Sequence, residues 1–186
     1  MLKTQVKRLS FIVACVIMQI SGEVNLFMKV ETGYLYHIKD SYFDKVNDNG
    51  LMINHENGKT RPKYFTIKDG EILWFIPLST KISKYQKIID KKIEKFGECK
   101  SIMIRTIADK KSAILLQNAF PTLTKYIDHV HLENGKPLKV IEKLKNEVLI
   151  NFNSMLALHK QGKKVFFPDI DKLKQMMLDE LKEDLN

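Results

Sequence analysis

The apolar positions between residues 34 and 78 come in short runs separated by turn signals, a spacing typical of β-strands. Such runs occupy residues 34–38, 60–67 and 71–78. The last run includes an almost continuous apolar stretch at 72–76, which predicts a buried central strand. We expect this strand to end at Pro77, because proline cannot donate a backbone hydrogen bond to a neighbouring strand.

Pairs of turn-forming residues divide these strands. An Asn-Gly pair stands at 57–58 and an Asp-Gly pair at 69–70, and both sequences favour tight hairpin turns. The second pair would join residues 60–67 to 71–78 as an antiparallel hairpin. The segment 40–50 is mostly polar and is interpreted as a turn-rich connection.

A helical period appears after the hairpins. Apolar residues recur at helical spacing over 84–96, with Ser83 as the expected N-cap and Gly97 at the C-terminal end. Two more strands are expected at 101–107 and 113–119. The polar residues between them, at 109–112, would form their turn.

The last third of the chain is predicted to be helical. Pro121 opens a loop or short helix through Tyr126, and a third turn pair, Asn-Gly, stands at 134–135. Apolar spacing then predicts helices over 138–159 and 169–185. Since strands and helices do not alternate regularly, we predict an α+β fold, with helices packed on an antiparallel, partly closed sheet.

Length and charge limit the possible functions. The chain has 186 residues and 44% hydrophobic content, which suits one domain with a real core. The 31 basic and 22 acidic residues give a net charge of +9. This balance favours a polyanionic partner, and both nucleic acid and an anionic membrane fit. A soluble basic protein without such a partner is the alternative.

The first 27 residues allow two interpretations. Lys3, Lys7 and Arg8 precede an apolar run at 9–20, and small residues follow, which is the layout of a signal peptide. The run is too short for a comfortable transmembrane helix. Alternatively, translation starts at Met28 and residues 1–27 are a mis-assigned extension.

We favour the start at Met28, with residues 28–186 as a single domain, because the rest of the sequence resembles a cytoplasmic RNA-binding protein. Without residues 1–27 the net charge falls only from +9 to +7. Cys99 would be the one remaining cysteine after the loss of Cys15, so no internal disulfide could form. A reducing, cytoplasmic location is the simpler inference.

Familiar catalytic motifs are missing from the sequence: it has no GxGxxG, GxxxxGK[ST], HExxH or GxSxG. His129 and His131 flank Val130, so in a strand both would face the same side. They could be half of a metal site or an ordinary surface pair, and no third ligand is obvious. We expect no metal and no cofactor.

Residues 61–66 and 76–81 carry side chains that suit metal-free RNA cleavage. In that reaction the 2′-hydroxyl attacks the adjacent phosphate, which needs cations on the developing charge and a group that handles the proton. Lys63 and Lys81 can supply the cations. The hydroxyls of Ser79 and Thr80 can bind the phosphate.

Aromatic side chains near the start of the domain could complete such a site. Tyr36, His37 or Tyr42 could position the nucleotide or carry a proton. Each residue type also has a purely structural interpretation. Residues 78–81 could be a loop and helix cap, Lys63 a solvated hairpin residue, and the aromatic residues part of the core.

Three segments, in order and spacing, resemble the ToxN/AbiQ toxins of type III toxin–antitoxin systems, and most closely their CptN branch. Residues 36–43 resemble the family's opening strand with its functional tyrosine. Pro-Lys-x-Phe at 62–65 resembles the segment with the active-site lysine. Residues 77–81 resemble the Pro-Leu-Thr-Ser segment that supplies hydroxyls, although here the order is Ser-Thr and the proline usual after it is missing. Lys59 replaces a tyrosine common in the family, so that tyrosine's role is not assigned to it.

The resemblance implies a sheet related to the MazF/Kid toxin barrel with added helices. It also implies a metal-independent endoribonuclease that leaves 2′,3′-cyclic phosphate ends on cellular or phage RNA. The partner would be a repeated non-coding RNA antitoxin, cut by the toxin into pseudoknotted units that inhibit it in a closed protein–RNA assembly. No membrane is expected. The catalytic residues would be Lys63, Ser79, Thr80 and Tyr42, and the RNA-binding residues Tyr36, His37, Lys39, Lys59, Arg61, Lys81 and Lys84.

Two other functions remain open from sequence. A non-catalytic basic RNA-binding module would bind RNA in a salt-dependent way without cutting it. A secreted or membrane-associated basic protein would explain the apolar run at 9–20, and the mass of the mature N-terminus distinguishes it from a protein that starts at Met28.

Overall fold

The apolar run that begins at Ile72 forms the longest described strand, β5 (Ile72–Ser79), and all of its residues are buried. The structure is a computed structural model that describes residues 30–52, 54–56, 59–60 and 63–184, with only the backbone for 55–56, 59–60 and 63–67. Residues 31–186 belong to one compact unit. The central buried strand predicted from the sequence is confirmed.

Seven strands form the main sheet in the order β6-β7-β5-β4-β1-β9, and β8 pairs with β5 beside β7. Every described pair in this sheet is antiparallel. In the described part of the chain no pairing joins β6 to β9, the two ends of this order, so closure into a barrel stays a prediction. The strands other than β5 are β1 (Leu35–Ile38), β4 (Lys63–Asp69), β6 (Met103–Ile107), β7 (Lys110–Ile114), β8 (Phe120–Thr122) and β9 (Ile127–Val130).

Pro77 does not end the central strand, so that prediction was wrong. On one side of β5, residues 73–75 pair with β8 and residues 78–79 pair with β7. Pro77 falls where one partner gives way to the next, and its carbonyl still accepts the N–H of Leu115 at 3.0 Å. A missing N–H is tolerated at such a junction.

A helix replaces much of the turn-rich connection expected at 40–50. Helix α2 (Asp40–Val46) buries Tyr42 and Val46, which lie four residues apart and so share one face. It ends at Asn47, whose backbone is left-handed and whose N–H donates to the carbonyl of Phe43. Burial of two large side chains outweighs the polar composition of the segment.

Helix α3 (Ile82–Phe96) confirms the helix expected after the hairpins, but not its cap. Lys81, not Ser83, occupies the N-cap position, and its side chain makes no capping bond. Gly97 closes the helix with φ of 78°, and its N–H donates to the carbonyl of Ile93, as the sequence predicted.

The turn between β6 and β7 lies earlier than predicted. Ala108 and Asp109 both have positive φ and form it, so β7 begins at Lys110 and the strand expected at 113–119 is displaced. Positive φ at both central residues matches the twist of a two-residue hairpin. Residues beyond Ile114 instead form a short 3₁₀ helix, η1 (Leu116–Asn118).

Two of the three turn pairs lie where the sequence placed them. The pair at 69–70 joins β4 to β5, and the pair at 134–135 joins β10 (Leu132–Glu133) to β11 (Lys136–Pro137). The pair at 57–58 lies outside the described residues. The strands on either side of it, β2 (His55–Glu56) and β3 (Lys59–Thr60), are antiparallel partners.

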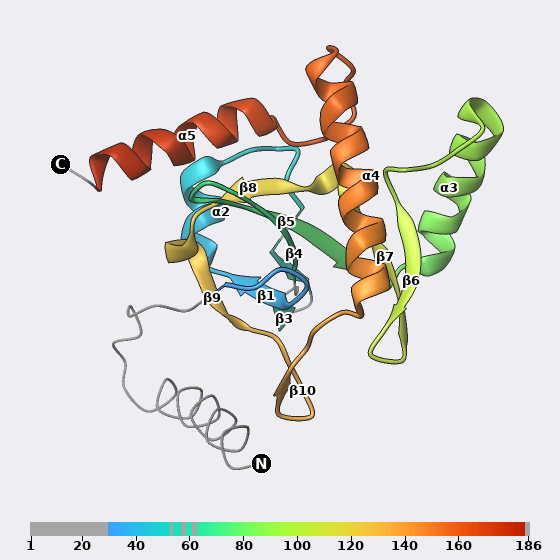
Figure 1. Cartoon of the computed structure of the whole chain (residues 1–186), viewed down its shortest axis with the longest axis horizontal. Helices are drawn as coiled ribbons and strands as arrows, with labels where there is room; N and C mark the ends of the chain where they lie inside the picture. Colours follow the sequence, from blue (N-terminus) through green and yellow to red (C-terminus); the bar gives the residue numbers. More distant parts are fainter. Residues whose placement is uncertain (1–29, 53, 57–58, 61–62, 185–186) are drawn as a thin grey trace, which may run out of the picture. The chain divides into compact units, whose positions relative to one another are not determined.

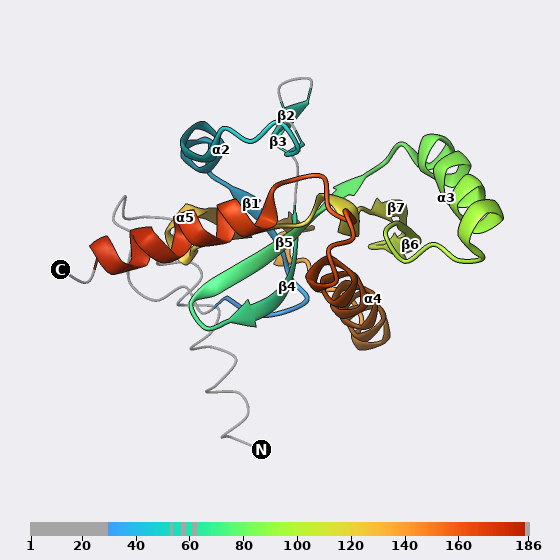
Figure 2. The same ribbon diagram turned by 90° about the horizontal axis from the view of Figure 1, so that it is seen from above.

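Helices cover the sheet at separate places. Helix α3 contacts β6 and β7, while α5 (Ile170–Glu183) contacts β8 and β5 (Figure 1). Figure 2 shows α3 standing beside the β6–β7 hairpin, far from α5. Helix α4 (Glu142–Lys160) contacts β4 and η1, and its Phe152 packs against Trp74. These helices and the antiparallel sheet confirm the α+β class.

A second 3₁₀ helix, η2 (Thr124–Tyr126), follows β8 and leads into β9. This agrees with the expectation of a loop or short helix before Tyr126. Among the helices that the structure describes, none has the length and apolar character needed to cross a membrane.

Candidate active site

One row of the sheet brings together the three segments that carry the family resemblance. The Cα of Lys63 in β4 pairs with that of Tyr36 in β1 on one side and with that of Pro77 in β5 on the other. Strands lie about 4.8 Å apart, so the row spans roughly 10 Å. Ser79 follows Pro77 by two residues and therefore lies on the same face of the sheet.

Ser79, Thr80 and Lys81 form the turn from β5 into α3. The Ser79 side chain is nearly buried, at 9% exposure, and its Oγ accepts the N–H of Lys81 at 3.3 Å. Thr80 and Lys81 are exposed. The Ser79 hydroxyl thus helps to shape this turn, and its hydrogen remains available to donate to a phosphate oxygen.

The N-terminus of α3 adds positive potential at this place. Backbone N–H groups of the first helical turn point outward and favour an anion. The first turn of α3 holds no acidic residue. It carries Lys84, which is exposed and lies 5.5 Å from the ring centre of Tyr85. Phosphate groups of RNA fit this potential.

The two tyrosines assigned to the site lie beneath the surface. Tyr42 has no exposed area, and its hydroxyl donates to the carbonyl of Pro121 at 2.6 Å. Burial raises the pKa of Tyr42 well above its ordinary value and raises that of Tyr36 to about 12. The Tyr36 hydroxyl accepts the backbone N–H of Glu31 at 3.0 Å. Both hydroxyls therefore stay protonated at neutral pH, and both have packed protein partners.

The structure describes the side chains of only some of the basic residues that we predict to bind RNA. Lys39 is exposed, and its Nζ donates to the carbonyl of Lys125 at 2.9 Å. Arg61 lies outside the described residues. Lys59 and Lys63 are described by their backbone alone, so their side-chain roles stay predictions.

Three histidines gather beside the row, which sequence reasoning missed. His37 pairs with His129 across β1 and β9, and the two rings stack with centres 4.3 Å apart. Nε2 of His37 lies 2.9 Å from Nδ1 of His131. Burial lowers the pKa of His131, while the carboxylate of Glu133 opposes the shift. No local pattern in the sequence indicates that β1 and β9 are neighbours.

This histidine cluster is not arranged as a metal centre. In the part of the chain that the structure describes, no three His, Cys, Asp or Glu side chains converge in a way that could hold a metal ion. The Asp128 carboxylate lies 2.8 Å from Nδ1 of His129, on the exposed side of the cluster.

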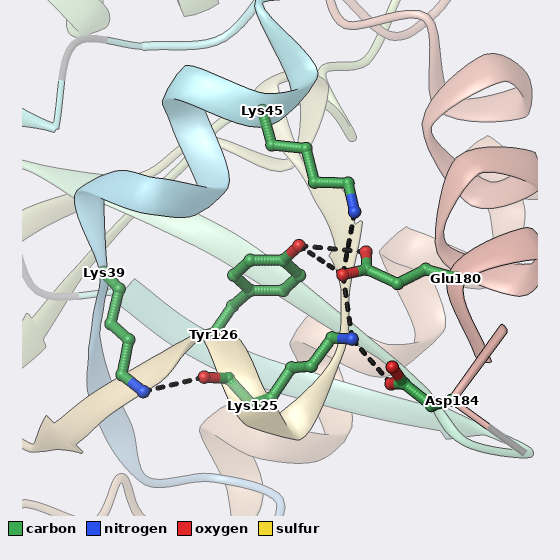
Figure 3. Close-up of polar contacts among 6 residues, drawn as sticks. All are labelled: Lys39, Lys45, Lys125, Tyr126, Glu180 and Asp184. Carbon is green, nitrogen blue, oxygen red and sulfur yellow. Dashed lines mark hydrogen bonds and ion pairs between the residues drawn. The ribbon is translucent and has the colours of Figure 1, made fainter.

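An ion-pair network fixes the C-terminal helix near the sheet (Figure 3). Glu180 of α5 accepts hydrogen bonds from Lys45 of α2, and from Lys125 and the Tyr126 hydroxyl in η2, at 2.7 to 2.9 Å. Lys125 also pairs with Asp184 at 2.6 Å. Burial alone would raise the pKa of Glu180, but these donors lower it to about 2. Because all its partners are protein groups, this network is structural.

Solved structures include proteins whose fold is similar to that of this chain. AbiQ, described as a lactococcal anti-phage endoribonuclease of the type III toxin–antitoxin system, aligns with a TM-score of 0.65 over 82% of this chain and 99% of its own. The fold is similar to that of AbiQ. Sequence identity with AbiQ is 13%, so the likeness concerns the fold alone.

A second solved structure also has a fold similar to that of this chain. It comes from a description of selective toxin inhibition by a non-coding RNA pseudoknot in bacterial type III toxin–antitoxin systems. It aligns with a TM-score of 0.59, at 15% identity, over 81% of this chain and 98% of its own. No protein-family model and no curated protein sequence matches the chain.

Proposed function

We propose that the chain is a metal-independent endoribonuclease toxin of the ToxN/AbiQ type, controlled by an RNA antitoxin. One observation carries this proposal: the row Tyr36–Lys63–Pro77 leads to Ser79 at the start of α3, in a fold similar to that of AbiQ. The position of Lys63 and the hydroxyls of Ser79 and Thr80 thus lie on neighbouring strands and their connection, next to the N-terminus of α3.

The reaction assigned to this site is attack of the RNA 2′-oxygen on the adjacent phosphorus, with departure of the 5′-oxygen and a 2′,3′-cyclic phosphate product. Lys63 would neutralise the charge that develops on the phosphate. Ser79 and Thr80 would donate hydrogen bonds to its oxygens, and Lys81 and Lys84 would bind neighbouring phosphates. Tyr42, which is buried, would act by holding the site from beneath.

The proposed inhibitor is a repeat-derived, pseudoknotted RNA. The second structural neighbour is described with such inhibition, and a net charge of +9 suits a folded polyanion. The proposal includes a closed protein–RNA assembly, membership of the CptN branch, a barrel related to MazF/Kid and a cytoplasmic location. It also retains Tyr36, His37, Lys39, Lys59 and Arg61 as RNA contacts.

Substitutions at the row test the site. Lys63→Ala and the double change Ser79→Ala/Thr80→Ala should each lower the cleavage rate by about a hundredfold or more, because each removes stabilisation of the transition state. Lys163→Ala is the matched control, since Lys163 is an exposed lysine in the segment that follows α4. A folded protein with all three site residues changed that cuts RNA at the wild-type rate contradicts the assignment.

A non-catalytic RNA-binding module is the second candidate, and the near burial of Ser79, whose Oγ is engaged with the Lys81 N–H, favours it. This candidate predicts a salt-dependent complex with intact RNA. Changes across the lysines of α3 would then weaken binding more than Lys63→Ala.

A further inference from the structure

A cavity of about 420 Å³ lies beside β6, between α3 and α4, and the proposed reaction does not use it. Strand β6 is the last strand of the described sheet order and pairs with β7 alone, so its outer edge faces this cavity. The side chains that matter most for its character are Gln86, Ile89, Ile93, Met103, Arg105 and Asn151.

The lining of the cavity combines apolar side chains with polar and charged ones, among them Glu98, Lys100 and Glu147. Ile89 and Ile93 come from α3, and Met103 from β6. The amide of Asn151 makes only a weak contact in the structure, with the sulfur of Met103 at 3.3 Å. The amide of Gln86 bonds to Asp90 on the same helix. Apolar side chains beside amide and charged groups suit a small planar ligand that carries hydrogen-bonding groups of its own.

The backbone of β6 adds a hydrogen-bond donor at the cavity. The Ile104 carbonyl accepts a hydrogen bond from Nη1 of Arg105 at 2.8 Å, so it points away from β7 toward the open edge. In a strand, the N–H and C=O of one residue point to the same side, so the Ile104 N–H also faces this edge. Because Arg105 already occupies the carbonyl, the Ile104 N–H is the backbone group at this edge that can bond to a nucleobase, as a donor to one of its acceptor atoms.

The position of the cavity relates it to the candidate active site. Ser79 pairs with Ala113, and Ala113 pairs with Ile104, so the three Cα atoms form one row across β5, β7 and β6. Two strand spacings separate Ser79 from Ile104, which is roughly 10 Å. A nucleotide next to the bound phosphate can reach across this distance.

Charge favours RNA as the occupant. Helix α3 carries five lysines against two acidic residues over Ile82–Phe96. Four of these lysines are exposed, namely Lys84, Lys87, Lys91 and Lys95. Single-stranded RNA is recognised by splayed bases that enter pockets while basic residues hold the phosphates.

An extended peptide, added as a further strand to β6, is the other possible class of occupant. Two observations disfavour it. Arg105 already covers the Ile104 carbonyl, and the same side chain forms a bidentate ion pair with Glu147 of α4. Charged side chains laid over a sheet edge in this way block strand addition.

We propose that this cavity is a base-recognition pocket for a nucleotide adjacent to the cleaved phosphate. Base binding stands on the cavity itself, whereas its part in cleavage rests on the proposed ribonuclease function. The pocket would supply sequence preference: the Ile104 N–H and Asn151 contact the edge of the base, and Ile89 and Ile93 contact its face.

The test uses the full chain with Lys63→Ala, so that binding is separated from cleavage, and the four 5′-ribonucleoside monophosphates as probes. We expect chemical-shift changes around Ile93 and Asn151 that are strongest for one base. Ile93→Trp should fill the cavity and weaken that binding about tenfold. Because Ile93 is 46% exposed, this change should leave the fold intact. Ile150→Trp, at a 67% exposed position of α4, is the matched control.

Cleavage of a random RNA pool gives the second readout. In the chain with Lys63 restored, Ile93→Trp and Asn151→Ala should each flatten the preference at one nucleotide beside the cut, whereas the control Ile150→Trp should leave it unchanged. Equal binding of all four nucleotides, unchanged preference in both variants, or capture of extended peptides instead overturns the pocket. Selective nucleotide binding without any cleavage contradicts the ribonuclease function and leaves the pocket standing.

Discussion

Glu180 shows how one residue can join three segments that are far apart in the sequence. Its carboxylate is nearly buried, with 10% of the side chain exposed, yet it accepts bonds from two lysines and a tyrosine. A buried carboxylate is costly without partners and stabilising with them. The network joins α2, η2 and α5, so loss of this one charge should loosen the C-terminal helix.

The pKa of Glu180 makes this contribution dependent on pH. The pKa lies at about 2 in the folded chain, below its ordinary value of 4.5. The carboxylate therefore stabilises the fold fully above about pH 4.5, and this stability is lost as the pH falls toward 2. The difference corresponds to about 3 kcal/mol.

Urea unfolding of Glu180→Gln and wild type at pH 7, 4 and 3 measures this contribution. We expect the variant to be less stable by about 1–3 kcal/mol at pH 7, and the gap to narrow as the pH falls. Asp184→Asn is the control, because the Asp184 side chain is 53% exposed and should change stability little. If the stability difference between Glu180→Gln and wild type is the same at all three pH values, the Glu180 carboxylate is not the source of the pH dependence.

Gly50 lies where a side chain has no room. A Cβ added to it would meet the carbonyl oxygen of Phe167 at 2.2 Å, closer than any real contact. Gly50→Ala should therefore separate the loop after α2 from the segment before α5, with a cost of about 2–4 kcal/mol. Gly70→Ala is the comparison: a Cβ there meets nothing within 4 Å, and only its positive φ costs energy, about 1 kcal/mol. Equal loss of thermal stability in the two variants contradicts this explanation.

At the scale of elements, helix α4 depends on one apolar face. Phe152 is fully buried and contacts Trp74 of β5 and Phe166 beyond the helix. Phe152→Ala should destabilise the chain by about 3–5 kcal/mol in chemical unfolding. Ile150→Ala removes a side chain that is 67% exposed, and the change should stay within about 0.5 kcal/mol. Similar losses of stability in Phe152→Ala and Ile150→Ala would mean that α4 does not pack through the face that carries Phe152.

Most helices and strands could be predicted from the sequence, and the wrong predictions have physical causes. Periodic apolar spacing and the turn pairs sufficed for the β4–β5 hairpin and for α3, α4 and α5. The strand continued past Pro77 because its partner changes at that residue. Helix α2 formed because Tyr42 and Val46 share one buried face. Neither tertiary cause can be read from local sequence.

At the scale of the whole molecule, the candidate site was predictable as segments and not as an arrangement. Lys63 and Ser79 stood out by residue type and by resemblance. Their proximity depends on the register of β1, β4 and β5, which brings residues far apart in sequence into one row. The contact of His37 with His131 depends in the same way on the β1–β9 pair. For Tyr42 the sequence left a place in the site and a place in the core both open, and the fold buries it.

The most direct test of the account is incubation of the purified wild-type chain with a transcript of the proposed repeat antitoxin RNA, in EDTA, followed by analysis of the product ends. We predict discrete cuts that carry 2′,3′-cyclic phosphates and disappear with Lys63→Ala. Cleavage that stops in EDTA, or RNA that stays intact in a salt-sensitive complex, would contradict a metal-independent ribonuclease.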